Sequence, residues 1–203
     1  MTRVHVAAEG ESVESIAYQY GHFWETVWNA PENASLRALR KEPNILVPGD
    51  AVTVPALREK SVAVATTRVH TFRRRGVPSV LRVQLLAANR PRAGLAFTVT
   101  AGAMTRTGTT DAAGWVVCYL MPDVTRGELR LDATGERFTF QVGTVGPPET
   151  RRGQQTRLRN LGYGREGMAF EDCMRAFQRS QRLPETGEAD EATIAALQAA
   201  HGS

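Results

Sequence analysis

The sequence predicts an α+β multidomain protein in which a mixed α/β module, an antiparallel β-sandwich and a small helical bundle follow one another. Apolar residues recur at helical spacing near both ends of the chain, whereas the middle carries short runs of β-branched and aromatic residues. Clusters of proline and glycine separate these patterns. We therefore expect domains at residues 1–58, 61–145 and 149–203.

The first segment opens with a strand and a capped helix. Val4–Val6 is a short strand candidate, and Ser12 is suited to cap the helix, because its hydroxyl accepts a free backbone N–H of the first turn. Gly21 ends the helix, where a left-handed residue is favoured. The apolar stripe at i, i+3, i+4 and i+7 consists of Val13, Ile16, Ala17 and Tyr20.

A second helical stretch and a closing strand complete a β-α-α-β order. The stretch begins near residues 23–28, is interrupted at Pro31 and resumes beyond it, with Leu36 and Leu39 expected to face inward. Turn signals then lead into a strand at residues 51–55.

The middle segment changes from helical to strand periodicity. Its runs are short and separated by turns, and strands at such intervals without helices are typical of an antiparallel sandwich. The predicted strands are Val62–Val64, Val80–Leu85, Phe97–Thr100, Trp115–Tyr119, Leu129–Leu131 and Arg137–Val142.

The last segment returns to helical spacing after a linker at residues 146–148. A helix is expected over residues 154–161, and Asp190 is suited to cap a final helix whose Ile194 and Leu197 face inward. Three such helices form a small bundle with a thin core. The stripe of the middle helix consists of Phe170, Cys173, Met174 and Phe177.

The first segment resembles a LysM module. Residues 9–17 (EGESVESIA) are similar to the opening of that family, and residues 44–55 (NILVPGDAVTVP) are similar to its ending. LysM modules bind glycans that contain N-acetylglucosamine, in a groove between these two loops. The connection over residues 29–43 is longer than in most members, so a groove covered by this insertion is the alternative. The glycan-binding residues that the resemblance implies are Gly10, Glu11, Ser12, Asn44, Ile45 and Leu46.

The other two segments also resemble known families. Residues 91–97 (PRAGLAF) and 108–115 (GTTDAAGW) are similar to a signature of prealbumin-like and immunoglobulin-like β modules, which implies a spacer or interaction domain. Residues 155–163, 176–178 and 186–197 resemble the peptidoglycan-binding-like domain, through QTRLRNLGY, AFQ and TGEADEATIAAL. That resemblance implies a wall-binding function.

The excess of positive charge lies in the middle segment. Residues 61–146 carry 11 Lys and Arg against 5 Asp and Glu, including Arg73, Arg74 and Arg75. These three arginines are a candidate partner-binding patch, and a solvated basic face is the alternative. The patch has no interleaved aromatic residues, so we expect no nucleic-acid partner.

We expect neither a membrane partner nor a signal peptide. The chain has no apolar run of about 18 residues, the length that a membrane span needs. Acidic residues at Glu9, Glu11 and Glu14 occupy the region where a signal peptide has its apolar stretch. The expected location is cytoplasmic, with delivery to the periplasm or to a target cell by an injection apparatus.

No catalytic, metal-binding or cofactor-binding pattern is present. The sequence has no HExxH or CxxC motif, and its four histidines are scattered over all three segments. Cys118 lies in a strand pattern and Cys173 on an apolar helical stripe, so both are expected in cores rather than in a nucleophilic pair. We therefore expect a protein that is not an enzyme, with no cofactor.

Trp24 and Trp28 are a second candidate partner site. They lie four residues apart on one helical face, and an exposed pair can stack on a sugar ring or a protein. The favoured alternative is that both pack as core.

Two functions from different classes follow. The first is glycan or peptidoglycan binding, in which linked modules gain avidity. The second is an adaptor for a spike protein or toxin of a type VI secretion or related contractile injection system. The three-part arrangement and the WNAPEN sequence at residues 28–33 resemble proteins associated with such systems.

Overall fold

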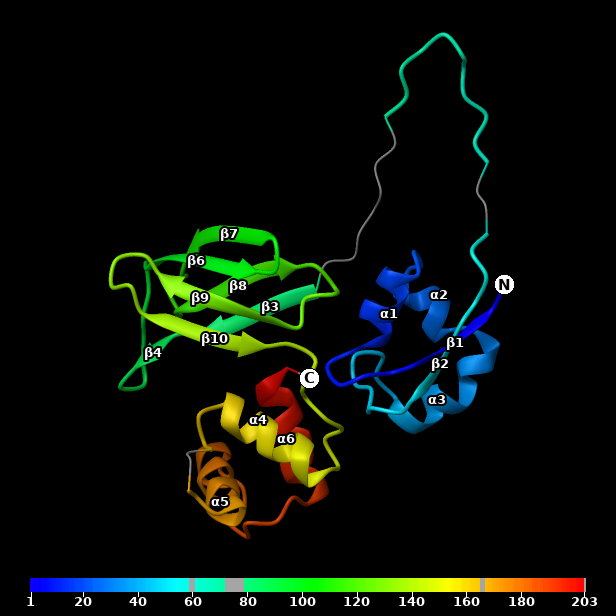
Figure 1. Ribbon diagram of the computed structural model, residues 1–203. Coiled ribbons are helices and arrows are strands. Elements are labelled where there is room, and N and C mark those ends of the chain that lie inside the picture. The colour runs from blue at the N-terminus through cyan, green and yellow to red at the C-terminus, as the bar shows by residue number, and fades with distance from the viewer. Residues whose placement is uncertain (59–60, 72–78, 165–166, 203) are drawn as a thin grey trace.

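The computed structural model describes residues 1–58, 61–71, 79–164 and 167–202 (Figure 1). It contains both helices and antiparallel strands, as the sequence predicts. Among these residues, no helix has the length and apolar character needed to cross a bilayer. The elements are β1 (Arg3–Val6), α1 (Val13–Gln19), α2 (Trp24–Trp28), η1 (Pro31–Asn33), α3 (Ala34–Arg40), β2 (Ala51–Val54), β3 (Ser79–Gln84), β4 (Leu86–Ala87), β5 (Arg90–Pro91), β6 (Ala96–Ala101), β7 (Met104–Thr109), β8 (Trp115–Leu120), β9 (Arg126–Leu131), β10 (Arg137–Gln141), α4 (Arg151–Asn160), α5 (Phe170–Gln181) and α6 (Glu191–His201).

Three hydrophobic cores follow one another along the chain, each built from consecutive elements. We call the elements β1 to β2 the N-terminal module, β3 to β10 the β module, and α4 to α6 the helical module. Figure 1 shows the three modules gathered around one another, with the C-terminus close to the centre of the molecule.

The N-terminal module packs its helices on an antiparallel pair, β1 and β2. Ser12 caps α1 as predicted: its hydroxyl accepts a hydrogen bond from the Ser15 backbone N–H (3.1 Å), and the Ser15 hydroxyl accepts one from the Ser12 N–H (2.9 Å). Such a capping box satisfies two N–H groups that the helix cannot. The core residues are Ala7, Val13, Ile16, Ala17, Val27, Trp28, Leu36, Leu46, Val52 and Val54.

Asn33 ties the long connection of this module to strand β2. Its amide nitrogen donates to the carbonyl oxygens of Val27 (2.7 Å) and Thr53 (2.8 Å), and its amide oxygen accepts from the Thr53 N–H (2.8 Å). Since Asn33 is only 1% exposed, these bonds satisfy a polar group that water cannot reach.

Helix α3 is the predicted resumption of the second helical stretch beyond Pro31. Leu36 is buried as predicted, but Leu39 is 65% exposed, so its predicted inward position was wrong. The inward stripe of α3 runs through Leu36, Arg37 and Arg40 and leaves Leu39 on the opposite side. Arg40 on this stripe pairs with Asp50 (2.7 Å), next to β2.

The β module has two antiparallel sheets around one core. One sheet has the order β10-β9-β6-β7, the other pairs β3 with β8, and β4 and β5 form a short ribbon. Side chains from both sheets meet between them, as in a sandwich. The core residues are Leu85, Phe97, Val99, Ala101, Val116, Cys118, Leu120, Leu129 and Leu131.

One predicted strand of this module was wrong, and one long strand was not predicted. Val62 and Val64 lie in coil and are 54% and 45% exposed, because no described segment offers them backbone hydrogen bonds. Conversely, β7 was not predicted, because its sequence MTRTGT has only one strongly apolar residue. β7 forms because it pairs with β6 over its whole length.

The helical module consists of α4, α5 and α6, and α4 begins at Arg151 instead of at the predicted residue 154. Asp190 caps α6, where its carboxylate accepts a hydrogen bond from the Thr193 N–H (2.7 Å). Leu197 is buried and Ile194 is half-buried. The core residues are Leu158, Cys173, Met174, Phe177 and Leu197.

Residues 146–148, predicted to be a linker, instead pack against helix α4. The side chain of Gln154 donates to the Pro148 carbonyl (2.9 Å), and the buried Arg157 donates to the Gly146 carbonyl (2.8 Å). Burial lowers the pKa of Arg157, and the negative charge of Glu149 opposes this shift. The β module and the helical module are therefore joined by a packed segment.

Candidate functional site

The two loops predicted to bind glycan lie side by side in the N-terminal module. The backbone N–H of Val13, directly after the first loop, donates to the carbonyl oxygen of Pro43, directly before the second (2.9 Å). The fold therefore brings together residues that are more than thirty positions apart in the sequence.

Within this pair of loops, the side chains of Ile45 and Leu46 point inward. They are 5% and 7% exposed, so they are core residues and present only backbone groups to a ligand. Asn44 is exposed, whereas Gly10, Glu11 and Ser12 are half-buried.

Glu11 organises the first loop. Its carboxylate accepts a hydrogen bond from the Ala8 N–H (2.8 Å) and lies 2.8 Å from Nε2 of His5. The Nδ1 atom of His5 in turn lies 3.2 Å from the Tyr20 hydroxyl. Partial burial favours a raised pKa for Glu11, but the bonds from Ala8 and His5 outweigh it, so its pKa lies below the usual value. Glu11 therefore holds the loop as an anion.

Other modules contact this first loop. The Cβ of any larger residue at Gly143 would overlap the carbonyl group of Gly10, so the chain after β10 passes directly over it. Arg152 of α4 forms an ion pair with Glu9, and the Ser79 hydroxyl donates to Glu14 on α1 (3.0 Å). One side of the predicted glycan loop is thus covered by the chain itself.

Replacing Gly143 with alanine is expected to separate the N-terminal module from the β module. The new Cβ collides with Gly10, and the left-handed φ of 80° disfavours alanine by roughly 1 kcal/mol. Small-angle scattering measures the result as a larger radius of gyration. Gly135→Ala is the matched control, since Gly135 also has a positive φ but open space around it. An unchanged radius for Gly143→Ala would contradict this contact.

The tryptophan pair is packed rather than exposed. Trp28 is 9% exposed and belongs to the core of the N-terminal module, and Trp24 packs half-buried against the same core. Both tryptophans therefore pack against the core, which is the alternative that the sequence favours over a partner site. The other candidate partner residues, Arg73, Arg74 and Arg75, lie outside the described residues.

Helix α4 presents a basic face to solvent. Arg151, Arg152 and Arg159 are exposed on it, whereas the opposite side of the helix enters the core. Arg151 stacks on the Phe170 ring (4.4 Å to its centre) and pairs with Glu171 (2.9 Å). Arg159 forms no ion pair with another described residue, so its guanidinium is available to an anion.

The basic face of α4 was not predicted from the sequence, although a signal was present. Four arginines fall within residues 151–159 (RRGQQTRLR), and only Arg157 lies on the apolar stripe of the helix. The remaining three must therefore lie on its outer side, because a helix turns by about 100° per residue.

The comparisons with known proteins concern the helical module. Residues 149–197 match the model of the family described as "Putative peptidoglycan binding domain". The match covers α4, α5 and most of α6, and it confirms the resemblance predicted for the C-terminal segment. No curated protein and no solved structure matches the chain. The LysM resemblance of the N-terminal module stays a prediction.

Proposed function

We propose that this chain binds peptidoglycan without cleaving it, through the basic face of α4 in the helical module. The observation that carries the proposal is the match of residues 149–197 to a peptidoglycan-binding family. The peptide stems of peptidoglycan carry free carboxylates. Arginine is well suited to them, because its planar guanidinium forms two parallel hydrogen bonds with a carboxylate.

The non-catalytic part of the proposal is supported by the surroundings of the two thiols. Cys118 and Cys173 are both buried, and burial raises the pKa of the Cys118 thiol. A raised pKa disfavours the thiolate, which is the nucleophilic form. No group of His, Cys, Asp and Glu within the described part of the chain has the arrangement of a metal site.

A LysM-like N-terminal module would supply a second contact with the same polymer. The β1–β2 pair, the helices between them and the adjacent loops at residues 10–12 and 43–46 support this assignment. Two weak sites on one chain bind a polymer more tightly than either alone, because the second contact is intramolecular.

The alternative is an adaptor that binds only protein, a spike or a toxin of a type VI secretion or related contractile injection system. The coverage of the first glycan loop by Gly143 favours it, because a sugar then has less of the loop to contact. In either form we propose a cytoplasmic protein that an injection apparatus delivers to the periplasm or to a target cell.

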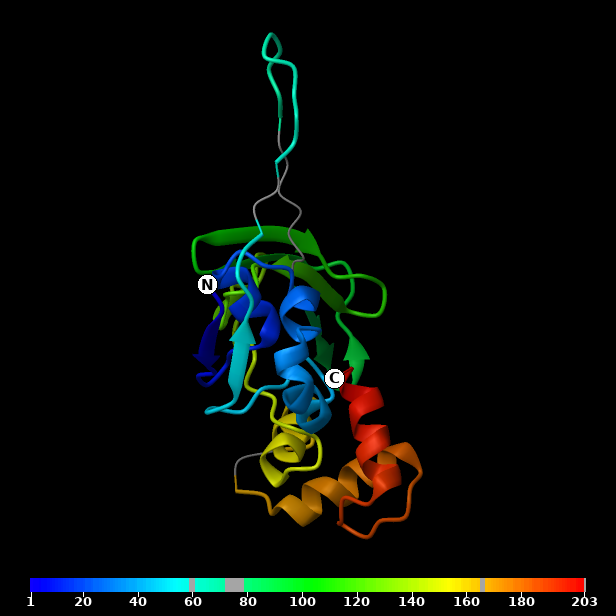
Figure 2. The same ribbon diagram turned by 90° about the vertical axis from the view of Figure 1, so that its right-hand side faces the viewer.

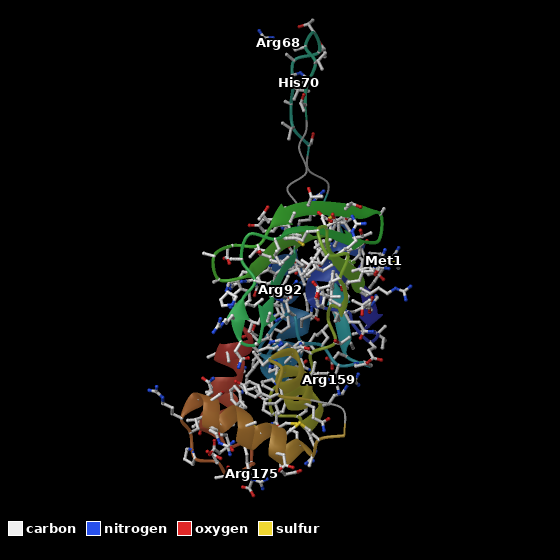
Figure 3. The ribbon with its side chains drawn as sticks, turned by 90° about the vertical axis from the view of Figure 1, so that its left-hand side faces the viewer. Met1, Arg68, His70, Arg92, Arg159 and Arg175 are labelled. Carbon is white, nitrogen blue, oxygen red and sulfur yellow. The ribbon has the colours of Figure 1, made fainter. Side chains whose placement is uncertain are left out.

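Charge reversal at Arg159 tests the proposed surface. In sedimentation with purified sacculi, we expect Arg159→Glu to weaken binding about tenfold, because a repulsive contact replaces an exposed arginine–carboxylate pair of at most about 1 kcal/mol. Arg175→Glu, the same change on α5, is the matched control and is expected to bind as the unaltered chain does (Figure 3).

Three outcomes separate the hypotheses. Retention on sacculi that chitin oligomers compete supports a glycan contact in the N-terminal module. Equal binding by the Arg159 and Arg175 variants removes α4 from the site. Absence of any retention refutes peptidoglycan binding and favours the protein-binding adaptor.

A further inference from the structure

The two sheets of the β module are unequal, and the smaller one has an open edge. Four strands face only two, because β3 pairs with β8 and with no other strand in the described part of the chain. An edge of this kind presents unpaired N–H and C=O groups to which a further strand can bind.

The open edge of β3 lies on the β10 side of the module. β8 lies on the opposite side, where it contacts β7. Arg106 of β7 is close enough to Cys118 of β8 for its positive charge to oppose the rise in the thiol pKa that burial causes. A strand added beside β3 would therefore lie over β10.

Apolar side chains at this position lack a cover. Phe138 pairs with the buried Leu129, so its ring is on the inner face of the larger sheet, yet it is 38% exposed. Leu81 and Val83 of β3 also face inward and are only half-buried. The position beside β3 therefore has both an unpaired backbone edge and exposed apolar side chains for an added strand to cover.

The chain contains a segment with the pattern that this place requires. Residues 61–66 (SVAVAT) alternate apolar and small side chains over six residues, which is the length of β3. They have no strand partner among the described residues, and Val62 and Val64 are about half exposed. Figures 1 and 2 show the segment that contains them projecting far from all three modules, and Figure 3 shows Arg68 and His70 near its tip.

We propose that residues 61–66 of a second copy of this chain add to the β3 edge, in a reciprocal exchange that forms a dimer. Val62 and Val64 of the incoming strand cover Phe138, Leu81 and Val83, while Ala63 and Ala65 face solvent. The second copy is the occupant because the segment projects away from its own β module, whereas donor and acceptor are present on every copy. Exchange of identical elements is a common route to closed dimers.

Replacing Val62 and Val64 with aspartate in the full chain tests the proposal. We expect the unaltered chain to be dimeric by light scattering at micromolar concentrations, with slow hydrogen exchange at residues 61–66. Val62→Asp with Val64→Asp should raise the Kd of the dimer by roughly 10,000-fold, because the reciprocal dimer buries four such valines and each contributes about tenfold. Its thermal unfolding should not change at a concentration where both proteins are monomeric, since both residues are exposed in the single chain.

Ala63→Asp with Ala65→Asp is the control, because these side chains face solvent in the added strand and the dimer should persist. A monomer with fast exchange at residues 61–66 overturns the proposal. So does a monomer with slow exchange there, which would mean that the segment binds its own β module. Equal loss of the dimer in both double variants also overturns the proposal. In an added strand only Val62 and Val64 face inward, so aspartate at residues 63 and 65 should not have the same effect.

Discussion

Replacing Gly153 with alanine is expected to destabilise the helical module, although the same change in an ordinary helix stabilises it by about 1 kcal/mol. The Cβ of alanine at this position would overlap the carbonyl oxygens of Pro147 and Gly146. These backbone atoms cannot move alone, because the Thr150 N–H and hydroxyl both donate to the Pro147 oxygen (3.0 and 2.7 Å). We expect a net loss of roughly 2 to 4 kcal/mol, the range of severe steric changes in packed sites.

Hydrogen exchange of the α4 amides measures this effect locally. A chain with three cores need not unfold in one step, so a single melting temperature is a poor measure. Gln155→Ala is the matched control, since Gln155 is exposed on the same helix and alanine there should leave exchange unchanged or slower. Slower exchange for Gly153→Ala as well would show that residues 146–148 are a loose linker after all.

The features that the sequence predicted well are local ones. Ser12 and Asp190 cap helices because a side chain and a backbone N–H three residues later are close in any helix start. The stripe that includes Phe177 was likewise predictable, because helical spacing alone places its residues on one face.

The errors concern features that depend on distant parts of the chain. Val62 and Val64 have the composition of a strand, but a strand forms only where another offers it an edge. β7 shows the reverse: a polar sequence becomes a strand because β6 lies beside it. Proline and glycine at residues 146–148 signal a linker, whereas their packing depends on Arg157 and Gly153.

The candidate site divides in the same way. The proximity of the loops around Gly10 and Asn44 follows from the predicted order of elements. The inward position of Ile45 and the contact of Gly143 with Gly10 depend on tertiary packing, which no local pattern encodes. A glycan site therefore cannot be inferred from a loop motif alone, because its accessibility is set by neighbouring modules.

A dimer of the kind proposed above would present two helical modules to one wall polymer. Because each arginine–carboxylate contact at an exposed face is weak, such pairing would raise the retention on sacculi more than any single contact on α4 does. The Val62 and Val64 double variant should then bind sacculi more weakly than the unaltered chain, with an intact basic face. Dimer formation would thus strengthen binding to the wall, although light scattering tests the dimer and sedimentation of the Arg159 variant tests the basic face.

The last large effect is expected for Gln178→Leu, which removes the polar centre of the helical module. Gln178 is fully buried, and its amide nitrogen donates to the Thr186 hydroxyl (3.0 Å) and the Glu188 carbonyl (2.9 Å), while its amide oxygen accepts from the Gly187 N–H (2.9 Å). Leucine has a similar size but leaves the buried Gly187 N–H without this acceptor, whereas the Thr186 hydroxyl and residue Glu188 keep only their contacts with each other.

We expect a loss of roughly 1 to 3 kcal/mol, the cost of one buried group left without a partner. The loop over residues 184–190 should then exchange its amides faster, and α6 should lose the cap that Asp190 provides at the end of this loop. Gln181→Leu makes the same change at an exposed position of α5 and should have little effect. If both variants have equal exchange, the loop is held by its own turns and Gln178 only fills space. If only Gln178→Leu loosens the loop and also lowers retention on sacculi, the fold of the matched region and its binding to the wall depend on the same buried amide.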